Sequence, residues 1–344
     1  MTISIRASAA WLGPRTYLED ARVVADGGIV VASGAASDVE PPDEIEEIVL
    51  DGFLMPAVAD RHVHIELSDS ASVLLRGVTA VRDLAWPAER IFPLAGASEL
   101  PSYNGPLIRA TGPMLTGPGG YPTLDGWAPS GTGRELKDAD DAADAVRELA
   151  GRGAAAIKVS LNAEAGPTPS DAELMTICET AHASDLQVTV HAQGRGQVER
   201  ALGAGVDELA HTPWVRLSDD VVAAAARQLR IVSTLDILSF GRDTPQVRTA
   251  LDNLRRFHTS GGSVVYGTDL GNGPIPPGIH TREAILLAEA GLEYEEVLEA
   301  MVRASLQPGA PADLLVTTRN PLDDLHALDE LLLVARAGRI VFAH

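Results

Sequence analysis

Short apolar runs alternate with longer amphipathic segments from about residue 54 to residue 304, and this pattern restricts the fold more than any other feature of the chain. The runs have the length of strands, whereas intervening segments such as DADDAADAVRELAGRG and SDAELMTICETAHASD have the apolar spacing of helices. Alternating strands and helices favour a parallel sheet. Eight such runs within about 250 residues match a (β/α)8 TIM barrel better than an open sheet.

The two ends of the chain have a different character. Residues 1–54 contain short β-type runs such as ISIRASAAWL and GIVVASG, and residues 308–344 contain ADLLVTT and ELLLVARAGRIVFAH. We therefore expect the two ends to form one small β-sandwich domain, and the barrel to occupy residues 55–307. The predicted fold class is α/β, with a (β/α)8 TIM barrel and a composite β-sandwich domain.

The charge and the apolar content restrict the partners. The chain has 48 acidic and 27 basic side chains, a formal net charge of −21, which repels phosphate backbones and anionic membrane surfaces. No apolar run approaches the ~20 residues of a membrane span, and the first residues lack the long apolar segment of a secretory signal. The single cysteine, Cys178, fits a reducing compartment. We expect a cytoplasmic protein that acts on a small molecule, with no nucleic acid or membrane partner; a homo-oligomer is compatible with these features.

Polar side chains of metal-binding type stand at the ends of five of the eight apolar runs. His62 and His64 follow the first run, and residues i and i+2 of a strand point to the same face. At the C-terminal end of a barrel strand, this face opens into the barrel mouth, where the active sites of this fold lie. Two neutral imidazoles placed in this way can chelate zinc or a similar divalent metal. The other four run ends carry Lys158, His191, His211 and Asp269.

Each of these residues also has a purely structural interpretation. A lone histidine at a strand end can be a hydrogen-bonded residue of a cleft, Lys158 can be an ion-pair partner, and Asp269 can cap the turn that follows it. Their joint placement at the same end of one predicted barrel favours a metal site over a set of separate structural roles.

Six segments contain further recognisable motifs and together span nearly the whole chain: MPAVADRHVHIEL, GVTAVRDL, AAAIKVSL, VTVHAQGRGQVERALGAGVDELAHTP, VVYGTDLG and GAPADLLVTTRNPLDDL. In these segments the chain resembles the amidohydrolase superfamily, in particular its imidazolonepropionase-like and prolidase-like branches. The resemblance implies a TIM barrel with a small β-sandwich domain, and a site for two divalent metal ions, with zinc as the favoured metal. One departure is AMVRASLQPGAPADLLV, which is shorter than the corresponding segment of the family.

The resemblance also implies a role for each residue of the metal site. His62 and His64 would hold the first metal, and His191 and His211 would hold the second. Asp269 would bind the first metal and take a proton from the attacking water.

Lys158 matches the position at which binuclear members of the family carry an N6-carboxylysine that bridges both metals. Only Lys137 and Lys158 among the 27 basic residues are lysines. A carbamate can form on an amine but not on a guanidinium group, which gives the rare lysine a reason to be present. A mononuclear site with Lys158 as an ordinary ion-pair partner remains the alternative.

A hydroxide that bridges two dications is a strong nucleophile at neutral pH, because metal ions lower the pKa of bound water. We therefore expect a metal-dependent hydrolase, binuclear in form, that cleaves a C–N bond of an amide, peptide or cyclic amide. The alternatives are lactone or phosphoester hydrolysis, a decarboxylase or isomerase on the same scaffold, and an inactive binding protein. Candidate substrate-binding residues lie on loops beyond the run ends, where loop packing would explain them equally well: Tyr121, Trp127, Gln193, Arg195, Trp214, Asn272 and His280.

Overall fold

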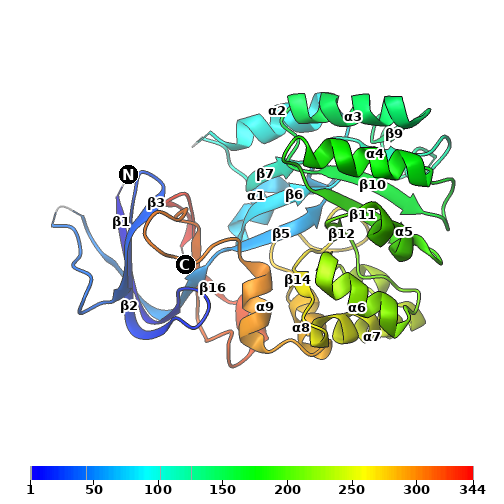
Figure 1. Ribbon diagram of the computed structural model, residues 1–344. Coiled ribbons are helices and arrows are strands. Elements are labelled where there is room, and N and C mark those ends of the chain that lie inside the picture. Colours follow the sequence, from blue (N-terminus) through cyan, green and yellow to red (C-terminus); the bar gives the residue numbers. More distant parts are fainter. Residues whose placement is uncertain (1, 44, 101, 125, 344) are drawn as a thin grey trace.

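The computed structural model describes residues 1–344 except residues 1, 44, 101, 125 and 344. It contains a sheet built from strands of both chain ends, and an α/β region built from the middle of the chain (Figure 1). In Figure 1, the labels β1, β2, β3 and β16 mark the first part at the left, and the strands and helices of the second part occupy the right.

Strands from both ends of the chain pair in one sheet, in the order β17-β16-β15-β4-β1-β2-β3. The neighbours β1 and β4 are parallel, and the other pairs are antiparallel. A separate apolar core with Ile5, Val23, Leu54 and Leu314 covers this sheet. The strands are β1 (Ile3–Trp11), β2 (Tyr17–Asp26), β3 (Ile29–Ala35), β4 (Ile48–Pro56), β15 (Leu314–Thr317), β16 (Leu331–Arg336) and β17 (Arg339–Ala343).

The strands of the middle region form two parallel sheets, in the orders β5-β6-β7 and β14-β13-β12-β11-β10-β8-β9. The first sheet consists of β5 (Val58–Val63), β6 (Val78–Asp83) and β7 (Leu107–Ala110). The second consists of β8 (Met114–Thr116), β9 (Gly133–Glu135), β10 (Ile157–Asn162), β11 (Val188–Gln193), β12 (Glu208–Leu209), β13 (Arg230–Val232) and β14 (Ser263–Val265).

Helices connect most of these strands, and several begin where the sequence supplies an N-cap side chain. Ser170 and Glu173 form a capping box at α4, and Asp138 and Ser218 accept backbone N–H groups at α3 and α6. No described helix combines the length and the apolar character that crossing a bilayer requires. The α-helices are α1 (Ser70–Leu75), α2 (Ala88–Ser98), α3 (Ala139–Gly151), α4 (Asp171–His182), α5 (Gln197–Ala204), α6 (Asp219–Gln228), α7 (Pro245–Thr259), α8 (Thr281–Glu289) and α9 (Tyr294–Met301), and 3-10 turns cover Ile65–Leu67, Asp236–Leu238 and Leu325–Asp329.

Backbone hydrogen bonds bring the two parallel sheets together at both edges. Beside β5, the amide of Asp269 donates to the carbonyl oxygen of His62 at 2.8 Å, and beside β7 the amide of Ala155 donates to the carbonyl oxygen of Ala110 at 2.8 Å. The regular ladders are interrupted at these two places. The prediction of an α/β fold with parallel strands is confirmed, whereas closure into a (β/α)8 barrel and a two-sheet sandwich of the ends stay predictions.

The register of β10 and β11 determines which side chains face the main apolar core and which face the opposite side of the sheet. Ile157 and Val159 belong to the main apolar core, and they pair with Val188 and Val190 of the same core. Because side chains alternate along a strand, the residues between them face away from this core. These residues pair as well, Lys158 with Thr189 and Ser160 with His191.

Candidate metal centre

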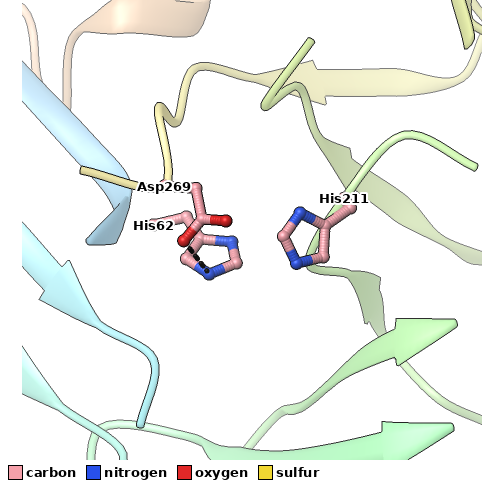
Figure 2. Close-up of side chains that lie close together, drawn as sticks. All are labelled: His62, His211 and Asp269. Atoms are coloured by element: carbon pink, nitrogen blue, oxygen red, sulfur yellow. Dashed lines mark ion pairs between the residues drawn. The ribbon is translucent and has the colours of Figure 1, made fainter. Parts of the chain in front are cut away.

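Four of the six predicted metal-site residues meet at the C-terminal end of β5. The Nε2 atoms of His62 and His64 lie 3.4 Å and 3.3 Å from Oδ1 of Asp269, which follows β14. His211 follows β12, and its ring centroid lies 4.5 Å from that of His62. His62, His211 and Asp269 offer ligand atoms that all lie within 4.8 Å of one another (Figure 2). All four side chains are buried.

His191 and Lys158 extend this group along β11 and β10. The ring centroid of His191 lies 4.4 Å from that of His211. Burial, and after it the positive charge of Lys158, lowers the pKa of His191 to about 3. The structure therefore brings all six predicted residues into one buried cluster, although their roles as ligands stay predictions.

Backbone carbonyl groups fix the orientation of both histidines of the His-x-His motif. Nδ1 of His62 lies 2.7 Å from the carbonyl oxygen of Ala210, and Nδ1 of His64 lies 3.1 Å from that of Ala85. A carbonyl oxygen only accepts hydrogen bonds, so in each neutral ring Nδ1 carries the hydrogen and Nε2 keeps its lone pair. This is the arrangement of metal-binding histidines, whose second nitrogen donates to a fixed acceptor.

The donor set fits a divalent cation. In their neutral forms, the two Nε2 lone pairs face the carboxylate of Asp269 with no hydrogen between them, an arrangement that a cation stabilises. Burial raises the pKa of Asp269, but His62 and His64 lower it to about 2, so the carboxylate is ionised at neutral pH. Burial lowers the pKa of His64, whereas its hydrogen bond with Asp269 raises it, and the net change is upward. In this structure, a proton on His64 is therefore the alternative to a metal ion.

Lys158 lies in an unusual environment for a basic side chain. It is fully buried, and its Nζ has no hydrogen-bond partner among the described residues. Burial lowers the pKa of this amine from 10.5 to about 7. A neutral amine of this kind is the form that can add carbon dioxide, so the residue fits the predicted N6-carboxylysine.

A buried ion-pair cluster surrounds Glu208 on the strand beyond β11. Glu208 is 1 % exposed and pairs with Arg82 of β6, and its Oε2 accepts from Nε of Arg230 at 2.8 Å. Arg82 also lowers the pKa of Lys158, after the larger effect of burial. The cluster therefore joins the two parallel sheets in the interior and adds positive charge near the lysine.

One positioning residue, Asp60, was not predicted from the sequence. The carboxylate of Asp60 accepts the amides of His62 and Thr268 at 3.0 Å and 3.1 Å, and the hydroxyl of Thr268 at 2.5 Å. Asp60 thereby holds β5 against the segment that carries Asp269. Its position two residues before His62, on the same face of the strand, is the only sequence signal for this role.

The predicted aromatic residues lie against the histidines. The ring centroid of Trp127 is 4.7 Å from that of His64, and the ring centroids of Tyr121 and Trp214 are 5.2 Å and 6.3 Å from that of His191. The structure therefore places all three aromatic side chains beside the cluster.

The other candidate substrate-binding residues are more dispersed. Asn272 donates from Nδ2 to Oδ1 of Asp269 at 2.9 Å, so it belongs to the cluster. Gln193 is buried at the end of β11, and neither polar atom of its amide has a partner among the described residues. His280 instead pairs with Asp236, with 2.8 Å between Nε2 and Oδ2. Arg195 is exposed and lines a surface cavity of about 440 Å³.

Comparison with known proteins finds similarity at the level of structure. No protein-family model and no curated protein matches the sequence. An amidohydrolase structure matches all of both chains with 21 % identity and a TM-score of 0.84. A Xaa-Pro dipeptidase with methionine bound in its active site also matches all of both chains, with 19 % identity and a TM-score of 0.85. A Bifidobacterium longum protein assigned as a prolidase is 25 % identical over 98 % of this chain and 94 % of its own, with a TM-score of 0.83.

These similarities extend over both the terminal sheet and the α/β region, because the matches cover 98 % to 100 % of the chain. They agree with the family that the sequence motifs predict. The chain therefore has the fold of these amidohydrolase and prolidase-like structures.

Proposed function

We propose that the chain is a metal-dependent hydrolase that cleaves a C–N bond of a small molecule. The observation that carries this proposal is the convergence of the Nε2 atoms of His62 and His64 on the carboxylate of Asp269 in a buried site. Proteins of the same fold include a Xaa-Pro dipeptidase, an ochratoxinase from A. niger and a phenylurea hydrolase. Their names support hydrolysis as the reaction class.

The fold proposed for this enzyme is a (β/α)8 barrel of residues 55–307, with a β-sandwich of residues 1–54 and 308–344. The backbone hydrogen bonds at both edges of the parallel sheets support the barrel, because they give the strands a cyclic order. The pairing of strands from both chain ends supports the composite domain.

The site would hold two divalent ions, with zinc favoured by its imidazole and carboxylate ligands. His62, His64 and Asp269 would hold one ion, His191 and His211 the other, and N6-carboxylated Lys158 would bridge them. When bound, the ions would supply an activated water nucleophile and polarise the bond to be cleaved. The unpartnered amine of Lys158 supports the bridging role, because an ordinary ion-pair partner would have a carboxylate beside it.

Asp269 is the residue that we assign to proton transfer. Its contacts with His62, His64 and Asn272 all use Oδ1, so Oδ2 is the oxygen that we assign to receiving the proton. The ionised state of the carboxylate at neutral pH leaves it able to take a proton from water and return it to the leaving nitrogen.

Tyr121, Trp127 and Trp214 would contact a planar or apolar part of the substrate, because they lie beside the histidine rings. The buried amide of Gln193 would bind a polar substrate group, because it needs a hydrogen-bond partner. We assign no substrate contact to Arg195, which is exposed, or to His280, which is paired with Asp236.

The experiment is metal removal followed by reconstitution with zinc and bicarbonate. The reconstituted protein is assayed with dipeptides, N-acyl amino acids and cyclic imides, and with lactones and phosphoesters for comparison. We expect hydrolysis of C–N bonds only after reconstitution, with kcat about 10²–10⁴-fold lower in the Asp269→Asn variant. Equal activity of the metal-free protein, or activity confined to lactones or phosphoesters, would contradict the proposal.

A further inference from the structure

We propose that Thr234 is a positioning residue that fixes the imidazole of His211 for metal binding. The inference rests on the proposed metal-dependent function and names a residue outside the predicted ligand set. It follows from a hydrogen bond, a backbone conformation and a network that holds this conformation in place.

The side chain of Thr234 contacts His211 directly. Its Oγ1 lies 2.9 Å from Nδ1 of His211, and both residues are buried. When Nδ1 donates its hydrogen to this hydroxyl, Nε2 keeps the lone pair that a metal ion needs. His62 and His64 are oriented by backbone carbonyls, whereas His211 depends on a side chain for the same purpose.

The backbone of Thr234 has an unfavourable conformation. Its φ is 42°, in the left-handed region, where β-branched residues are genuine outliers. Such a conformation costs on the order of 1–3 kcal/mol and persists only where the surroundings impose it. Glycine would fit this position without strain, so the presence of threonine indicates that its side chain is needed.

The residues around Thr234 impose the strained turn. On one side, its amide donates to the carbonyl oxygen of Gly267 at 3.0 Å. On the other side, the carboxylate of Glu283 accepts the amides of Leu235 and Asp236 at 2.7 Å and 2.8 Å. Glu283 is fully buried in the first turn of α8. The hydroxyl of Thr234 is therefore held at a fixed place beside His211.

A neighbouring hydroxyl provides a matched control. Thr212 follows His211 in sequence, is also buried, and donates its hydroxyl to the carbonyl oxygen of Ser233 at 2.8 Å. Thr234→Val and Thr212→Val each remove one buried hydroxyl from the same region with little change of shape. Only the first substitution removes the contact with His211.

The experiment measures the binding of Co²⁺ to the metal-free protein, by titration and by the visible absorption spectrum of the bound ion. Substitution of a residue that hydrogen-bonds a metal-ligating side chain typically weakens metal affinity 10–100-fold, and we expect a loss in this range for Thr234→Val. Thr234→Ser keeps the hydroxyl and should retain the wild-type affinity and spectrum, as should Thr212→Val. Thr234→Gly removes the strain together with the hydroxyl, so it should fold at least as stably as Thr234→Ala and still bind Co²⁺ weakly.

An unchanged affinity and spectrum in Thr234→Val, or an equal loss in Thr212→Val, would overturn the inference. If Thr234→Val does not fold, Thr234→Gly decides the question in the same way. A wild-type protein that binds no Co²⁺ would reject the proposed function and this inference together. A wild-type protein that binds Co²⁺ with an affinity insensitive to residue 234 would reject the inference alone.

Discussion

Replacement of Lys158 by methionine should stabilise the metal-free, bicarbonate-free protein at neutral pH. The substitution keeps an unbranched side chain, one atom shorter, and removes an amine that is fully buried and has no hydrogen-bond partner among the described residues. An ordinary ion-pair role for Lys158 predicts the opposite, because breaking a buried pair destabilises a protein by about 3–5 kcal/mol. The sign of the change therefore separates the two interpretations.

The size of the effect depends on pH. Burial lowers the pKa of Lys158 to about 7 from its usual 10.5. Between these values the unfolded chain binds a proton that the folded protein lacks, so the stability of the wild type rises by about 1.4 kcal/mol for each pH unit. The full penalty is present below pH 7, is bounded at about 5 kcal/mol, and disappears above pH 10.5. Mutational data on unpaired buried polar groups suggest about 1–3 kcal/mol as the realistic gain.

The assay is urea unfolding of wild type, Lys158→Met and Lys137→Met at several pH values from 7 to 9, with metal and bicarbonate removed. Lys137 is exposed, so its replacement should change the free energy of unfolding by less than about 0.5 kcal/mol. The advantage of Lys158→Met should shrink as the pH rises. A clear loss of stability at pH 7, or a gain that does not change with pH, would refute this reasoning.

Three further predictions follow from the site and its supports. Asp269→Asn should fold normally and bind substrate, but kcat should fall about 10²–10⁴-fold, as expected for loss of the proton-transfer group; kcat near that of the wild type would contradict this role. Glu208→Gln removes the charge of a buried carboxylate that pairs with Arg82 and Arg230, and it should lower the free energy of unfolding in urea by about 3–5 kcal/mol. A change below about 0.5 kcal/mol would show that this cluster is not important for stability. Addition of zinc at 100 times its Kd should raise the stability of the metal-free protein by about 2.7 kcal/mol, and an unchanged melting temperature would argue against specific binding.

The residues of the cluster could be predicted from the sequence, because they stand at the ends of apolar runs and because strand alternation places His62 and His64 on one face. Histidine and lysine are rare in this chain, which has nine histidines and two lysines, so their positions at the ends of apolar runs are informative. The apolar periodicity also predicts the α/β class, because burial against the helices selects alternate residues of each strand, as in Ile157 and Val159.

The residues that position the side chains of the cluster could not be predicted, because they act through contacts between segments that are distant in sequence. Asp60 binds Thr268 across 208 residues of sequence, and the hydroxyl of Thr234 reaches His211 only because of an unusual φ angle. No local pattern records either contact. The strands themselves are also hard to predict where they are very short. β12 contains only Glu208 and Leu209 and gives a weak sequence signal for a strand.

The most direct test of the account is X-ray diffraction at the zinc absorption edge from crystals of protein reconstituted with zinc and bicarbonate. The account predicts two anomalous peaks, one beside His62, His64 and Asp269 and one beside His191 and His211, with density for a carbamate on Lys158 between them. Absence of any peak at these side chains would contradict the metal centre. A single peak with an unmodified Lys158 would contradict the bridged pair of ions.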